Sequence, residues 1–396
     1  MKLFDNESIK LDVLKKRAYN YRWAEVEEGV IPLTAADPDF PVAPEIINDL
    51  IDYIKEGYFS YTPKLGFPEF KESIAKALKL RKNEDINPDF VLPIDSAARG
   101  MYIIAKALLN PGDEVIIFDP VDFLFKESAL AAGAKPVLFP AKVVDGKIDI
   151  SKLEDYITPK TKMIGLCNPH NPLGMVYPPE DLKRMLDLAD KYDLYIMNDE
   201  IWSDIIFPEK EFTSILTVDP EKSERVFSVF GFSKSFGIAA LRAGCIYCTS
   251  KKTFDLIVEN SEVMTTAGGI SSLSQIAGMT CMDKCYYWVD EFKVHLTKNR
   301  DYAVERINSI PGIYCEKPQA TYLLFVNISS TGLSSQEFVD FMKSEMKLAL
   351  VPGSDEFFGP GSKGYVRICF ATSFEILKEG LDRFEAGIKK LTKSKI

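Results

Sequence analysis

Short apolar runs alternate with helical patterns from about residue 90 to residue 250. The runs cover residues 114–118, 135–139, 163–167, 194–198, 226–229 and 243–248, and a helical pattern at 180–192 opens after two prolines. Alternating strands and helices predict an α/β fold with a mostly parallel sheet flanked by helices. Ligands of such sheets bind beyond the carboxyl ends of the strands, so the residues that follow each strand are the first candidates for chemistry.

The rest of the chain has a different pattern. A long helical stretch begins near residue 285, followed by a strand at 322–327, a helix at 335–347, a strand at 365–370 and a final helix. The 396 residues also exceed what one hydrophobic core usually supports. We therefore expect a large domain of residues 46–285 and a smaller α+β domain of residues 1–45 and 286–396.

Charge and hydropathy restrict the partners. The formal net charge is −10, and no cluster of lysines and arginines reverses it locally, which argues against nucleic acid and anionic membranes. The N-terminal residues lack the apolar segment of a secretory signal, and the longest apolar runs are too short to span a bilayer. We expect a cytoplasmic protein.

Cysteine and histidine usage restricts the chemistry. Seven cysteines, an odd number without a targeting signal, predict free thiols, and the Cys245/Cys248 pair in a predicted strand is interpreted as buried core thiols. The chain has only two histidines, His170 and His295, too few for a histidine-rich metal site, and we expect no metal. Acid–base chemistry must then use other groups, such as a lysine with an organic cofactor.

A glycine pattern of the dinucleotide-binding type occurs at residues 359–364, Gly-Pro-Gly-Ser-Lys-Gly. Such a fingerprint needs a strand before it and a helix after it, whereas here a strand follows. We interpret it as a glycine-rich turn, which leaves an oxidoreductase without its main support.

Three other strand ends carry more specific residues. Asn171 lies in Asn-Pro-His-Asn-Pro-Leu-Gly after the strand at 163–167, and Asp199 follows the strand at 194–198. Lys234 lies in Phe-Ser-Lys-Ser-Phe-Gly after the strand at 226–229, with Arg242 eight residues later. Taken singly, these are an ordered loop, a helix cap and a solvated lysine. A lysine removed from water beside other cations, however, loses pKa and becomes a nucleophile.

Together and in this order, these motifs resemble the fold type I pyridoxal phosphate enzymes, the aspartate aminotransferase superfamily, from about residue 32 to the C-terminus. The resemblance implies that Lys234 binds pyridoxal 5′-phosphate as a Schiff base. It also implies that Asp199 faces the pyridine nitrogen and that Asn171 bonds the ring hydroxyl. Arg242 is similar in position to the family's phosphate-binding arginine, with Ser233 as the nearby hydroxyl.

The phosphate is expected at the start of a helix that runs to residue 109. There the small residues Ala97 and Ala98 leave backbone amides accessible. Two nearby positions depart from the family pattern. Gly231 stands where many relatives have serine, and Trp202 stands where a tyrosine often bonds the ring hydroxyl; an indole can donate a hydrogen bond but cannot accept one.

A third departure is Asp122, which stands where the family usually has an aromatic residue stacked on the ring. Either Phe123 or Phe125 takes over the stacking, or Asp122 meets a cationic group of the substrate.

The resemblance also supplies a substrate site. Arg367 is similar to the superfamily arginine that binds the substrate α-carboxylate through two hydrogen bonds. Ala36 and Asn171 are expected beside the substrate. Tyr61 is similar to the tyrosine that reaches the cofactor phosphate of the neighbouring subunit, so we expect a homodimer.

The resemblance favours a pyridoxal phosphate-dependent aminotransferase that moves an amino group between an amino acid and a 2-oxo acid. A carbon–sulfur β-lyase is the alternative, because residues 36–40 and 168–174 resemble the cystathionine β-lyase and cystalysin group. Residues 242–244 are more similar to the aminotransferases. A pyridoxal-sensing transcription regulator would need an N-terminal DNA-binding domain, for which about thirty residues are too few.

Overall fold

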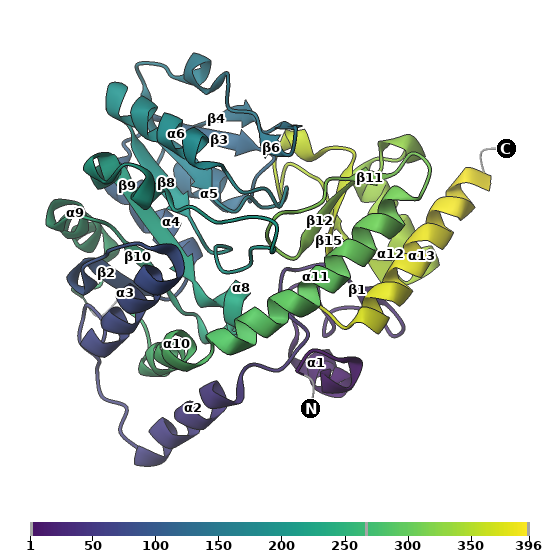
Figure 1. Ribbon diagram of the computed structural model, residues 1–396, viewed down its shortest axis with the longest axis horizontal. Helices are drawn as coiled ribbons and strands as arrows, with labels where there is room; N and C mark the ends of the chain where they lie inside the picture. Colours follow the sequence, from purple (N-terminus) through teal and green to yellow (C-terminus); the bar gives the residue numbers. More distant parts are fainter. Residues whose placement is uncertain (1–2, 266–267, 394–396) are drawn as a thin grey trace.

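The structure is a computed structural model that describes residues 3–265 and 268–393, and its larger part is built on one sheet (Figure 1). In spatial order the strands are β2 (Val91–Ile94), β10 (Gly244–Tyr247), β9 (Val226–Gly231), β8 (Tyr195–Asp199), β7 (Thr161–Cys167), β3 (Glu114–Asp119) and β4 (Lys135–Pro140). β10 runs antiparallel to both neighbours, and the other four pairs are parallel. The predicted α/β fold with a mostly parallel sheet is confirmed.

Both faces of this sheet are buried under helices. On one face lie α4 (Ala97–Leu108), α5 (Leu124–Ala131) and α9 (Lys251–Ser261); on the other lie α3 (Pro68–Lys82), α6 (Pro179–Lys191) and α10 (Ser272–Lys284). Alternate residues of β3 point into the two cores. Val115 and Ile117 pack in the core under α4, α5 and α9, and Ile116 and Phe118 pack in the core under α3, α6 and α10. This is why the strands have nearly continuous apolar sequences.

Further elements complete this part of the chain. They are α2 (Pro44–Glu56), α7 (Ile215–Val218), α8 (Phe232–Phe236) and the hairpin of β5 (Val143–Val144) and β6 (Lys147–Ile148). The helix expected up to residue 109 is α4, and the Ser96 hydroxyl caps it by accepting the amide N–H of Arg99 at 3.1 Å.

The C-terminal part begins with the long helix α11 (Tyr286–Asn308) and holds a second, antiparallel sheet. Its strands, in spatial order, are β11 (Tyr314–Cys315), β12 (Leu323–Asn327), β15 (Tyr365–Cys369) and β14 (Val351–Pro352). The helices α12 (Ser335–Met346) and α13 (Phe374–Lys393) lie beside it (Figure 1). The expected α+β pattern is therefore present, whereas the domain boundaries at residues 45 and 285 stay a prediction.

The N-terminal segment joins this C-terminal part. Its elements are α1 (Leu11–Arg17) and β1 (Ile31–Pro32), and β1 pairs in parallel with β13 (Leu348–Ala349). The buried Arg22 is paired with Asp39 and donates to the carbonyl oxygen of Ala35 at 2.9 Å. These contacts fix the segment around Ala36 against the rest of the molecule.

The glycine pattern at 359–364 forms a turn that precedes β15, as expected. The amide N–H of Gly361 donates to the Asp119 carboxylate at 3.0 Å, so the turn attaches the C-terminal part to the end of β3. All seven cysteines are free and buried. Within the described ranges, the helices are too short or too polar to cross a bilayer.

Candidate active site

Strand register brings the predicted site residues together. Cys167 at the end of β7 pairs with Asp199 at the end of β8, and Asp199 pairs with Val229 in β9. The chain segments that follow the three strands therefore leave the sheet at one edge. A cavity of about 410 Å³ lies there, a size typical of cofactor sites. Among the residues that line it are Ala36, Ala97, Ala98, Asn171, Asp199, Trp202, Ser233, Lys234, Arg242 and Arg367. Tyr61 lies elsewhere, with 96% of its surface exposed.

Lys234 projects into this cavity from the short helix α8, which directly follows β9. Its ammonium group donates to the carbonyl oxygen of Ala36 at 2.7 Å and lies 5.6 Å from the centre of the Trp202 ring. Burial lowers the pKa of Lys234 below its usual value, because the charged form is poorly solvated. The buried lysine therefore gives up its proton more readily than a solvated lysine.

Asp199 is the second buried ionisable group of the cavity. One oxygen accepts the amide N–H of Ile201 at 3.0 Å. Burial, together with the negative charges of Asp122 and Glu200, raises the pKa of Asp199 to about 7. A positive ligand group beside Asp199 would offset this cost, which fits a protonated ring nitrogen.

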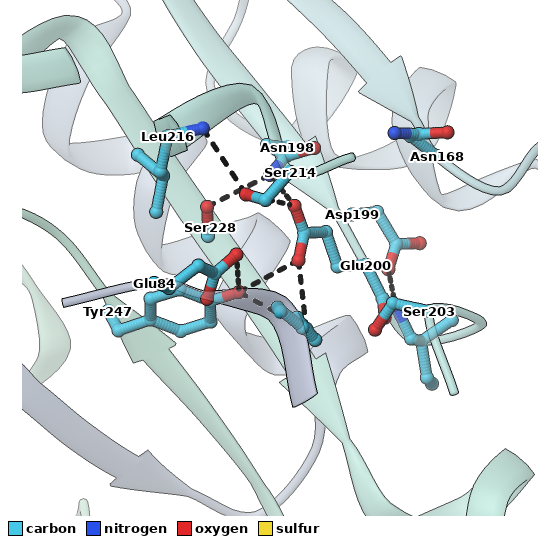
Figure 2. A network of polar contacts seen from close by, with 12 residues as sticks. Glu84, Asn168, Asn198, Asp199, Glu200, Ser203, Ser214, Leu216, Ser228 and Tyr247 are labelled. Atoms are coloured by element: carbon cyan, nitrogen blue, oxygen red, sulfur yellow. Dashed lines mark hydrogen bonds and ion pairs between the residues drawn. The ribbon is translucent and has the colours of Figure 1, made fainter. Parts of the chain in front are cut away.

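Glu200, the next residue, belongs to a separate buried network. Its carboxylate accepts hydrogen bonds from Lys82 at 2.8 Å and Tyr247 at 3.0 Å. It also accepts from Asn198 at 2.8 Å and Ser214 at 3.0 Å. Figure 2 shows Glu200 in the middle of these contacts and Asp199 to one side. No sequence motif marks this network, because Lys82 and Tyr247 lie far from Glu200 in the chain.

Glu84 adds a second carboxyl group to the network, 3.5 Å from the Tyr247 hydroxyl. The single positive charge of Lys82 can balance the negative charge of Glu84 or of Glu200, but not both. Burial and the nearby Glu200 charge raise the pKa of Glu84 to about 8, whereas Lys82 lowers the pKa of Glu200. Glu84 is therefore neutral and Glu200 ionised at neutral pH.

Arg367 and Asn171 meet at the other end of the cavity. The Arg367 guanidinium donates to the Asn171 side-chain oxygen at 3.3 Å and to the carbonyl oxygen of Thr34 at 3.5 Å. Its Nε is buried without a hydrogen-bond partner among the described residues. A buried donor without a partner is costly, so the arginine is suited to a carboxylate ligand.

The opposite end is formed by the start of α4. Its first amides have no acceptor within the helix and carry the positive end of the helix dipole. Gly244 permits the close approach of the sheet: a Cβ there would lie 2.7 Å from the backbone nitrogen of Ala97. A Cβ at Gly231 would lie 3.0 Å from Ile201 and 3.2 Å from the Cβ of Ala97. A side chain at position 231 would therefore be crowded by Ile201 and Ala97.

The structure decides between the two proposed aromatic residues. Phe125 does not line the cavity: it packs beneath β7, where a Cβ on Gly165 would meet its ring at 2.6 Å. The suggestion that Phe125 stacks on the ring is therefore wrong. Phe123 and Asp122 both line the cavity, and Phe123 is 40% exposed.

Several contributors had no signal in the sequence. The Tyr322 hydroxyl donates to the carbonyl oxygens of Ala36 at 3.3 Å and Lys234 at 3.4 Å. Tyr21, Phe357 and Phe358 form aromatic walls. They come from loops without a recognisable motif.

The cavity as a whole fits pyridoxal 5′-phosphate. An anion site at α4 and Arg242, a carboxylate for a ring nitrogen and an amine for an aldehyde carbon line one space. The individual residue assignments stay predictions.

The buried network yields a test in which two similar substitutions differ in effect. Glu200→Gln removes the carboxylate that pairs with Lys82 and accepts three further hydrogen bonds, and should lower the free energy of unfolding by about 3–5 kcal/mol. Glu84→Gln replaces a carboxyl that is already neutral and should cost ~1 kcal/mol or less at pH 6. Chemical denaturation of both variants and the parent measures the difference; equal losses would contradict the charge assignment.

The same pair has a defined pH dependence. The pKa of Glu84 rises from 4.5 in the unfolded chain to about 8 in the folded protein, so its contribution to stability is complete below pH 4.5. That contribution is lost as the pH rises from 4.5 to about 8. Glu84→Gln should therefore become progressively more stable relative to the parent across this range. A constant difference would show that Glu84 ionises normally.

Comparisons with known proteins agree with this geometry. The aminotransferase class I and II family model matches residues 28–384. The aspartate aminotransferase of Pyrococcus horikoshii is 31% identical over 98% of both chains. The aromatic aminotransferase structure from Pyrococcus horikoshii OT3 has a TM-score of 0.85 and 29% identity, covering 92% of this chain and 97% of that one. Cystalysin of Treponema denticola, solved with pyridoxal 5′-phosphate, has a TM-score of 0.90 and 25% identity, covering 99% and 100%. The chain therefore belongs to the aminotransferase class I and II family.

Proposed function

We propose that this pyridoxal 5′-phosphate-dependent aminotransferase uses Lys234 to move the proton during amino-group exchange between an amino acid and a 2-oxo acid. The cavity carries the proposal, because Lys234, Asp199 and Arg367 line one space without a histidine. When bound, the cofactor supplies an aldehyde carbon for the substrate amine and a ring that accepts electrons from the substrate α-carbon.

Lys234 is suited to the proton transfer because burial lowers the pKa of its amine. Its present partner, the carbonyl oxygen of Ala36, holds the side chain near the cavity wall. Asp199 keeps negative charge opposite the ring nitrogen, Asn171 offers its amide to the ring hydroxyl, and Arg242 holds the phosphate with α4. Trp202 and Ser233 complete the cofactor's surroundings.

Arg367 orients the substrate. Its unpaired Nε and its Nη groups lie together, so a carboxylate can accept two parallel hydrogen bonds. When the α-carboxylate is fixed, the α-carbon lies within reach of Lys234. The effective concentration of the lysine amine at the α-carbon proton is then high.

A carbon–sulfur β-lyase is the second candidate. The likeness to cystalysin over nearly the whole chain supports it, as do residues 36–40. A lyase needs the same α-proton transfer but then releases a β-leaving group.

One experiment separates the two reactions. The purified holoenzyme is mixed with single amino acids in the absence of an oxo acid. An aminotransferase should convert its cofactor to the amino form once per site and then stop, since no acceptor is present. Continuous release of pyruvate, ammonia and thiol from cysteine or cystathionine would establish the lyase instead.

We propose in addition that the enzyme is a homodimer in which Tyr61 completes the partner's site. Ile47, Ile51 and Ile54 lie on one side of α2 and are each more than 40% exposed, and the following segment exposes Tyr58 and Phe59. A contiguous apolar surface of this kind usually marks a protein interface. A second copy would cover it. The free buried thiols also support a cytoplasmic location.

Hybrid dimers test the shared site. Lys234→Ala alone should lower kcat by at least ~10²–10⁴-fold, and Tyr61→Ala alone should weaken cofactor binding. If Tyr61 acts on the partner, co-expression of the two variants creates hybrids with one intact site and restores about half the activity per hybrid dimer. Hybrids without restored activity, or a monomer in sedimentation, would contradict the proposal.

A further inference from the structure

Asp122 brings a negative charge into the cavity that the proposed function does not use. The charged residues that line the described cavity are Asp95, Asp122, Asp199, Lys234, Arg242 and Arg367. The three cations and Asp199 are assigned to the cofactor and the α-carboxylate. Two acids are left, and they lie at different ends. Asp95 directly precedes Ser96 at the start of α4, whereas Asp122 lies beside Asn171.

Hydrogen bonds fix Asp122 next to the expected substrate position. One carboxylate oxygen accepts the amide N–H of Leu124 at 3.1 Å, and the other accepts the Asn171 side-chain N–H at 2.9 Å. The same Asn171 amide accepts from Arg367 at 3.3 Å. A single amide therefore separates Asp122 from the arginine that binds the α-carboxylate. The substrate α-carbon and its side chain must then lie near Asp122.

Several of the remaining wall residues are aromatic. Phe358 lies 5.0 Å from the Arg367 guanidinium, and the rings of Phe357 and Tyr21 are 6.3 Å apart, edge to face. Aromatic walls pack well against an apolar stem and attract a cation. A carboxylate beside such walls completes a site for a side chain with an apolar stem and a positive end.

We propose that Asp122 makes this enzyme selective for amino acids with a basic side chain, an inference that rests on the aminotransferase function proposed above. An ammonium or imidazolium group on the substrate pairs with the half-buried carboxylate through a charge-assisted hydrogen bond. Burial raises the pKa of Asp122, and a positive substrate group offsets that cost. An acidic side chain would instead be repelled by Asp122. The three cations that line the cavity cannot offset this repulsion, because they are assigned to the cofactor and the α-carboxylate.

The test compares substrates of equal shape. L-Ornithine and L-norleucine have side chains of the same length and differ in the terminal ammonium group; L-glutamate supplies the opposite charge and L-phenylalanine an aromatic ring. Each is mixed with the holoenzyme without an oxo acid, and the single-turnover rate and half-saturating concentration are read from the cofactor absorbance. The parent is compared with Asp122→Asn, with Asp122→Glu, which keeps the charge, and with Asp95→Asn, which removes a charge at the other end.

The parent should use ornithine about tenfold or more better than norleucine, as expected for one buried charge-assisted contact. Asp122→Asn should bring this ratio close to one and improve glutamate, whereas Asp95→Asn and Asp122→Glu should keep ornithine ahead. A parent that prefers glutamate or phenylalanine to ornithine, or a ratio unchanged in Asp122→Asn, would overturn the inference. The aminotransferase function itself is checked separately from the selectivity. If no amino acid, charged or neutral, converts the cofactor to its amino form, the aminotransferase function is refuted.

Discussion

The parallel pairing of β7, β8 and β9 is the constraint on which the rest of the site depends. Hydrogen bonding sets Cys167, Asp199 and Val229 in register, so the chain reaches the same edge of the sheet three times. The end of each strand supplies one functional side chain: Asn171 after β7, Asp199 at the end of β8 and Lys234 after β9. Because the strands are buried on both faces, a one-residue shift of register would move each side chain into the opposite core, where the packing does not match it. The relative positions of the three groups are therefore fixed by the two cores.

The cavity gathers charges that are costly to bury. Burial lowers the pKa of Lys234 and Arg367 and raises that of Asp199 to about 7. A cofactor with an aldehyde, a ring nitrogen and a phosphate, together with a substrate carboxylate, offsets these costs. The Glu200 network behind the site differs, because its carboxylate accepts four hydrogen bonds from within the protein. It acts as a fixed support for the turn that carries Asp199 and Trp202.

The local sequence was sufficient for much of this structure. Continuous apolar runs predicted the central strands, and motifs just after them predicted Asn171, Asp199 and Lys234. The antiparallel direction of β10 was not predicted, because strand direction depends on the connections and not on the strand's own residues. The Glu200 network was missed for a similar reason, since Lys82 and Tyr247 are far from Glu200 in the sequence. The suggested position of Phe125 was wrong, because an aromatic residue after a strand can face either the core or the cavity. Gly165 has no side chain and leaves room in the core for the Phe125 ring.

The central claim is that Lys234 holds the cofactor through its side-chain amine, and covalent mapping tests it most directly. The holoenzyme is reduced with borohydride and digested, and the modified peptide is identified by mass spectrometry. The account predicts the mass of reduced phosphopyridoxyl on Lys234 and on no other lysine. Modification of a different lysine, or loss of the cofactor without any modified peptide, would contradict it.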